Sequence, residues 1–269
     1  MTNLPNNEWQ NITPRQLASH TAGLPHYKDN KDYIGLYKTM SLSTRYEQVE
    51  DSLEIFDEST LLFEPGTKWS YSTFGTVLLS AVMENAAKTP YLEIMNNQVF
   101  SPLGMNSTMA EFQGENSENL ASFYWNNKGR TDQVREWQDV DLSHRLAGGG
   151  FISTSSDLVK MGMAFLDDDF ISPETRATFW THQSLPDGTK TPMGYSLGWR
   201  VLTRDVDEGI GKITFVNHGG VSRGAQSWLM VIPEYNMSVA VNINSNTDVF
   251  WDFGKISMEL MKTFILNKK

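Results

Sequence analysis

A change in hydrophobic periodicity near residue 190 constrains the fold of this chain most strongly. Before that point, apolar residues recur with helical spacing, most clearly over 73–87, 91–100 and 155–166. After it, four short apolar runs have the character of strands, and one more helical segment follows them. Helices followed by a set of strands are typical of an α+β fold.

The strand-like runs follow one another closely, so we expect an antiparallel sheet, with a hairpin turn at 233–236. The expected strands cover 195–202, 213–217, 225–232 and 238–243. Ile256, Leu260 and Phe264 form an apolar stripe, which predicts that a last helix covers one face of this sheet. We therefore expect one folded unit with two parts, a mainly helical region over 1–190 and a sheet with a C-terminal helix over 191–269.

Local signals mark the beginnings of several elements in the first part. Residues 13–16 (TPRQ) have the form of a capping box with proline at the first helical position. Pro65-Gly66 predicts a tight turn shortly before Tyr71-Ser72, after which a buried helix begins. A further helix is expected over 45–56, whereas the polar segment 111–146 has no clean period and predicts irregular surface structure.

Composition removes several classes of function. The 269 residues contain no cysteine, which excludes disulfides, cysteine-ligated metals and a thiol nucleophile. The formal net charge is −10 and no basic cluster interrupts it, so we expect no nucleic-acid partner. No segment approaches the roughly 20 apolar residues of a membrane helix, and the first residues do not form a secretion signal. We expect a soluble acidic protein without a membrane span, in a compartment that the sequence leaves unassigned.

Two local patterns suggest chemistry but lack the context that it needs. Residues 220–224 (GVSRG) match the G-x-S-x-G nucleophile elbow, yet a strand-like run follows them and no histidine lies beyond His218. A glycine-rich loop between strands is the simpler interpretation. The five histidines fall in separate segments and no nucleotide-binding glycine motif occurs, so we expect neither a metal nor another cofactor. His218 differs from the rest because Gly219-Gly220 leave its backbone open to a ligand.

Several blocks, taken in order, resemble one known family. Residues 12–24 (ITPRQLASHTAGL) are similar to the family pattern I-T-x-R-x-L-L-S-H-T-S-G-L. The pattern continues with FEPG at 63–66, YSTFG at 71–75, PLGM at 102–105, AGGG at 147–150 and HGG at 218–220. The set resembles the beta-lactamase-related serine hydrolases, which include class C beta-lactamases, penicillin-binding-protein-like peptidases and family VIII esterases. The YSTFG block is most similar to the LACTB-type branch.

The resemblance implies a beta-lactamase/transpeptidase-like fold and the hydrolysis of a peptide, ester or amide through an acyl-enzyme. It implies that Tyr71 is the general acid/base, and that the backbone N–H of Val221 is an oxyanion donor, which acts on charge that develops in the transition state. The substrate-binding residues that it implies are Ser72, Thr73, His218, Gly219 and Gly220. Family members are often periplasmic or organellar, so the resemblance leaves the localisation open.

Two departures from the family pattern concern the reaction. Thr73 replaces the usual asparagine, which shortens or removes a contact to a substrate amide. No serine is followed by lysine three positions later, so the Ser-x-x-Lys motif, in which lysine activates the serine from the same helix face, is absent. We therefore expect a chain truncated at its N-terminus, which lacks the first strands and the nucleophile helix and is inactive alone.

Two interpretations stay open. In the first, the chain is a fragment of a serine hydrolase whose activity needs the missing segment. In the second, it is a short form that serves as a non-catalytic binding or assembly module and associates with itself through the open edge of its sheet. The retained Tyr71 and His218 blocks favour the first. Both predict an uncovered apolar surface and association in solution.

Overall fold

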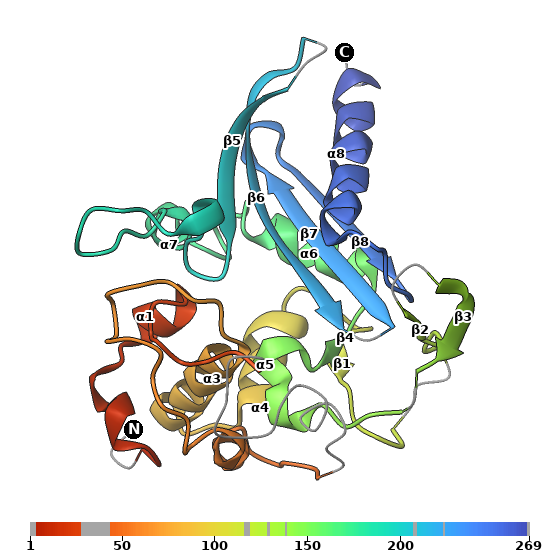
Figure 1. Ribbon diagram of the computed structural model, residues 1–269. Coiled ribbons are helices and arrows are strands. Elements are labelled where there is room, and N and C mark those ends of the chain that lie inside the picture. Colours follow the sequence, from red (N-terminus) through yellow and green to blue (C-terminus); the bar gives the residue numbers. More distant parts are fainter. Residues whose placement is uncertain are drawn as a thin grey trace.

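A helical part and an antiparallel sheet make up the computed structural model of this chain (Figure 1). The residues that the structure describes are 4–27, 44–115, 119–127, 130–137, 139–206, 209–222 and 224–267. Arg223 of the G-x-S-x-G match lies outside them. Within this part of the chain, no helix combines the length and apolar character that crossing a membrane would require.

The helical part is built around α3 (Thr73–Ala87), which the sequence predicts over the same residues. α1 (Pro14–Ala18) begins with the predicted capping box, in which Thr13 and Gln16 exchange hydrogen bonds. Both helices contribute to one buried cluster, whose members include Trp9, Leu17, Leu53, Phe56, Phe74, Val77 and Leu78. The other elements of this part are η1 (Asn7–Asn11), η2 (Glu50–Ile55), α4 (Tyr91–Met95), η3 (Asn96–Phe100), β1 (Met109–Ala110), η4 (Ser143–Arg145), α5 (Leu146–Gly149), β4 (Phe151–Ile152), α6 (Ser155–Ala164) and α7 (Pro173–Trp180).

Three expectations for the helical part need correction. The helix expected over 45–56 is the shorter 3-10 helix η2, and that expected over 91–100 passes from α4 into the π-helix η3. The segment 111–146 contains an antiparallel hairpin of β2 (Tyr124–Asn127) and β3 (Arg130–Glu136). The sequence does not predict these strands, because a strand with exposed side chains such as Tyr124 and Val134 has no buried face and so no alternation of apolar and polar residues.

The sheet has the strand order β5-β6-β7-β8, with antiparallel neighbours throughout. Its strands are β5 (Arg200–Val206), β6 (Gly211–Ser222), β7 (Ala225–Ile232) and β8 (Met237–Ile243). β5 begins later than expected, because η5 (Pro192–Gly194) and an irregular segment precede it. The predicted turn after β7 contains the 3-10 helix η6 (Pro233–Tyr235) and ends at Asn236, whose φ is +46°.

Side chains alternate between the two faces of the sheet, and each face has its own apolar cluster. Trp228, Met230 and Ile232 of β7 pack toward α8 (Phe250–Asn267). Leu229 and Val231, which point the other way, pack with residues of α6 and α7. The sheet therefore lies between α8 on one face and α6 with α7 on the other.

The expectation for the buried face of the last helix is wrong. Ile256, Leu260 and Phe264 are 49%, 41% and 60% exposed, whereas Met261 and Ile265 are buried against the sheet. α8 carries two apolar stripes with the same helical period. Periodicity identifies such stripes but does not tell which of them faces the sheet.

Candidate functional site

The end of β6 extends beyond its neighbour β5 and points toward α3 and α5 (Figure 1). β5 pairs with β6 no further than Asn217, whereas β7 pairs with it as far as Ser222. Residues 218–222 therefore have an edge that no described strand pairs with. Alternate N–H groups of a strand point to opposite edges, so part of this stretch directs its donors away from β7. An oxyanion donor at Val221 requires an edge of this kind.

Tyr71 lies between a tight turn and the start of α3. Gly66 has a φ of +87°, as the predicted Pro-Gly turn requires. The centroid of the Tyr71 ring lies 6.5 Å from that of His218. Burial raises the pKa of the Tyr71 phenol, and Arg200 and the Thr73 side chain oppose this shift only in part. The phenol is therefore neutral near pH 7.

Ser72 and Thr73 are buried at the N-terminus of α3. The Ser72 hydroxyl donates to the Pro25 carbonyl at 2.8 Å and accepts the Gly75 N–H at 3.0 Å. The Thr73 N–H donates to Nδ1 of His26 at 3.3 Å. The Ser72 hydroxyl thus gives its proton to a hydrogen bond within the protein and acts as the N-cap of α3 beside Tyr71.

His218 lies at the start of the unpaired stretch of β6, where its Nδ1–H donates to the Gly198 carbonyl at 2.6 Å. A carbonyl oxygen only accepts, so this bond fixes the neutral tautomer that carries its proton on Nδ1. Burial, and after it the charge of Arg200, lowers the pKa of His218 to about 4. At neutral pH His218 is therefore uncharged.

Gly219 and Gly220 follow His218 but have different surroundings. A Cβ on Gly219 would lie 2.2 Å from the Trp228 ring and 2.7 Å from that of Phe250. A Cβ on Gly220 would meet nothing within 4 Å. Gly219 is therefore required by packing between the sheet and α8, and Gly220 borders open space.

Arg200, at the start of β5, adds a buried positive charge to the site. Its guanidinium carbon lies 5.9 Å from the Tyr195 ring centroid and 5.3 Å from that of Trp251. The residue is only 8% exposed, and Nε and Nη1 have no hydrogen-bond partner among the described residues. Because unused donors on a buried cation are costly, this place suits an anionic group of a ligand.

His20 and Tyr195 complete an aromatic cluster around Tyr71. The His20 ring centroid lies 4.2 Å from that of Tyr71 and 4.8 Å from that of Tyr195, which in turn lies 6.1 Å from that of His218. Burial raises the pKa of Tyr195 and lowers that of His20 to about 3. The structure thus brings two of the sequence-predicted side chains, Tyr71 and His218, together with His20, Tyr195 and Arg200.

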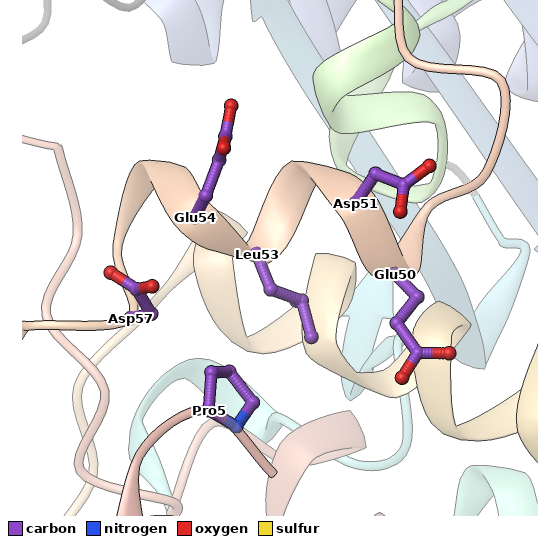
Figure 2. A pocket seen from close by; sticks show the side chains of 6 residues that line it. All are labelled: Pro5, Glu50, Asp51, Leu53, Glu54 and Asp57. Atoms are coloured by element: carbon purple, nitrogen blue, oxygen red, sulfur yellow. The ribbon is translucent and has the colours of Figure 1, made fainter. Parts of the chain in front are cut away.

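The described residues contain no group of three or more His, Cys, Asp or Glu side chains that could hold a metal ion. A cavity of about 230 Å³ lies elsewhere, along η2 (Figure 2). The residues that line it are Pro5, Glu50, Asp51, Leu53, Glu54 and Asp57. Its carboxylates point in different directions in Figure 2, so it offers no converging set of ligands.

Comparison with known proteins places this chain in a family. The family described as Beta-lactamase matches residues 2–255. The chain belongs to the beta-lactamase family. Within this family, the mitochondrial serine beta-lactamase-like protein LACTB of Mus musculus is 33% identical over 75% of this chain, and penicillin-binding protein 4* of Bacillus subtilis (strain 168) is 26% identical over 93%. The chain spans 39% of the former protein and 55% of the latter.

Solved structures share the fold of this beta-lactamase-family chain. The D-amino acid amidase of Ochrobactrum anthropi SV3 has a TM-score of 0.71 at 18% identity, over 95% of this chain and 73% of that one. The octameric penicillin-binding protein homologue of Pyrococcus abyssi has a TM-score of 0.70 at 20% identity, over 96% and 58%. The predicted α+β, beta-lactamase/transpeptidase-like fold is confirmed.

The sequence analysis does not predict three side chains of the cluster, namely His20, Tyr195 and Arg200. His20 lies inside the family block at 12–24, so the order of the blocks is a signal that points to it. Tyr195 and Arg200 lie in a segment that the sequence predicts as one strand. An isolated bridge pairs these two residues after η5, and no spacing in the sequence indicates that both lie in the cluster.

Proposed function

We propose that this chain carries the proton-transfer and substrate-binding half of a serine hydrolase site, which acts by acyl transfer on a peptide, ester or amide. The observation that carries the proposal is the approach of Tyr71 to His218, with ring centroids 6.5 Å apart, beside the unpaired edge of β6. A neutral phenol can relay a proton, passing its own proton to the leaving group while it accepts the proton of the nucleophile. The backbone N–H of Val221 would stabilise the oxyanion that forms when the nucleophile attacks the substrate carbonyl.

In this proposal the nucleophile is a serine outside the 269 residues, since no serine in them begins a Ser-x-x-Lys motif. Burial raises the pKa of Tyr71, and the charge that lowers it is that of Arg200. A lysine next to the nucleophile would lower the proton affinity of both hydroxyls further. We therefore expect no turnover by the chain alone.

Arg200 points to the substrate class. Its unpaired Nε and Nη1 are N–H donors that can each bond an anionic oxygen such as that of a carboxylate, in a buried place where such bonds are strong. The rings of Tyr195 and Trp251 flank the guanidinium and limit where an anion can approach it. We propose a substrate with a carboxylate near the acyl group that is transferred.

A fusion protein tests the catalytic proposal. A Ser-x-x-Lys segment from a family member is joined ahead of residue 1, and hydrolysis of p-nitrophenyl esters is measured. We expect turnover by the fusion and a decrease in kcat of about 10²–10⁴-fold on Tyr71→Phe. Tyr235→Phe is the matched control, because its hydroxyl lies near the Ile210 carbonyl, outside the cluster. An unchanged kcat in the Tyr71→Phe fusion would exclude the role given to Tyr71.

A separate observation favours a second function, that of a non-catalytic assembly module. Ile256, Leu260 and Phe264 form an exposed apolar stripe on α8, and β8 has no outer neighbour among the described strands. The structural relative from Pyrococcus abyssi is octameric. We expect oligomers in light scattering that Phe264→Lys dissociates. A monomeric wild-type chain would rule this function out.

A further inference from the structure

We propose that His20 is a positioning residue, which fixes the backbone on both sides of Tyr71 and connects this segment to Tyr195. The inference rests on the role proposed for Tyr71 as general acid/base. His20 lies just beyond Ser19, the C-cap of α1, and its ring, its carbonyl and its N–H each contact a different part of the chain. Together these contacts determine where the Tyr71 hydroxyl lies.

The two residues that flank Tyr71 both donate to His20. The Ser70 N–H donates to the His20 carbonyl at 3.0 Å, and the Ser72 N–H donates to Nδ1 of the His20 ring at 3.3 Å. The Tyr71 ring lies against the same imidazole, with centroids 4.2 Å apart. Tyr71 therefore cannot change its position without breaking at least one of these contacts.

His20 makes these bonds from a left-handed backbone conformation, with a φ of +60°. Residues other than glycine adopt this region rarely and at an energetic cost, so the surroundings must maintain it. The His20 N–H donates to the Leu17 carbonyl at 3.2 Å, which fixes the residue to the end of α1. The unusual φ lets the carbonyl reach Ser70 while the ring reaches Ser72.

The hydrogen bonds also determine the tautomer of His20. Because Nδ1 accepts the Ser72 N–H, the neutral ring carries its proton on Nε2, and Nε2–H donates to the Tyr195 hydroxyl at 2.8 Å. Burial above all, and then the two neighbouring histidines and Arg200, lowers the pKa of His20 to about 3. The ring thus stays neutral, and its two bonds persist, across the physiological pH range.

Two variants separate positioning from folding. Asparagine enters the left-handed region readily, and its side-chain oxygen can replace Nδ1 as the acceptor of the Ser72 N–H, whereas alanine provides neither property. The measurement is the spectrophotometric titration of Tyr71, taken as the difference between each protein and the same protein with Tyr71→Phe. We expect the Tyr71 pKa to fall by about one unit in His20→Ala, as the phenol gains solvent, and to stay unchanged in His20→Asn.

Leu17→Ala is the matched control, because it removes a buried side chain of α1 that belongs to the helical core. An unchanged Tyr71 pKa in His20→Ala would overturn the proposal, as would an equal shift in Leu17→Ala, which would reveal general loosening. A proton on Nδ1 of His20 in ¹⁵N NMR spectra would overturn it as well. These readouts need no hydrolysis, so they are distinct from the fusion experiment that tests the proposed function.

Discussion

Tyr71, His20 and His218 are each held neutral at pH 7 by their surroundings. Burial raises the pKa of the phenol and lowers the pKa of both imidazoles. Arg200 is therefore the charged member of the cluster, and its guanidinium carbon lies 5.9 Å from the Tyr195 ring centroid. An anionic ligand entering this cluster would meet one positive charge and several neutral hydrogen-bonding groups.

Asp157 gives a residue-scale prediction outside the site. Its Oδ2 accepts the Ser107 N–H at 2.8 Å and the Thr108 hydroxyl at 3.1 Å, and its Oδ1 pairs with Lys160 at 2.8 Å. Burial opposes ionisation, but Lys160 and these hydrogen bonds outweigh it, so the pKa of Asp157 is lowered. Asp157→Asn should reduce the free energy of unfolding by about 1–3 kcal/mol at pH 7.

The pH dependence of this effect follows from the direction of the shift. The stabilisation is present above the carboxyl pKa of the unfolded chain and is lost as the pH falls through the lower pKa of the folded state. The difference between wild type and Asp157→Asn should therefore shrink in acid. Urea denaturation in a series of buffers from pH 7 to about pH 3 measures it. If the difference in free energy of unfolding stays constant over this range, the charge of the Asp157 carboxylate is not the source of the stabilisation.

At the scale of elements, β6 joins the site to the core beneath it. A Cβ added to Gly219 would collide with the rings of Trp228 and Phe250, whereas a Cβ added to Gly220 would lie in open space. Gly219→Ala should lower the free energy of unfolding by about 1–3 kcal/mol through overpacking, and Gly220→Ala should change it by less than about 0.5 kcal/mol. Thermal unfolding of the two variants provides the measurement. Equal stabilities would mean that the contact with α8 adapts to the extra methyl group.

The elements also show what the sequence can and cannot predict. The capping box of α1, the bounds of α3 and the turn at Gly66 follow from local chemistry, and they are observed as predicted. The inner face of α8 is not a local property, because both of its stripes are apolar. Likewise the family blocks indicate Tyr71 and His218, but the position of Arg200 beside Tyr195 is a tertiary contact that no local pattern predicts.

For the whole molecule, three histidines with lowered pKa values predict destabilisation in acid. Burial lowers the pKa of His20 to about 3, and those of His144 and His218 to about 4. Histidines of the unfolded chain titrate near pH 6.5, so below that value the unfolded state binds more protons than the folded one. The free energy of unfolding should fall as the pH falls, by up to about 4 kcal/mol per pH unit near pH 5, where the difference approaches three protons.

Urea denaturation between pH 7 and pH 5 gives this slope, provided that the oligomeric state is held constant. In His144→Gln one proton is removed from the difference, and the slope should decrease by about a third. His182→Gln is the control. His182 is a partly buried histidine outside the cluster around Tyr71, and its ring contacts the Thr191 carbonyl. A stability that does not change over this range would mean that the three rings are solvated in the folded protein.

Tyr71, His218 and Arg200 should behave as one ligand site, and an NMR titration of the intact chain with an N-acetylated amino acid tests this most directly. The ring signals of Tyr71 and His218 should shift together along one saturating curve. Arg200→Gln should weaken the affinity about tenfold or more, whereas Arg176→Gln, which removes a surface ion pair with Asp168, should leave it unchanged. Ring signals that do not move, or equal affinity in Arg200→Gln, would contradict the site.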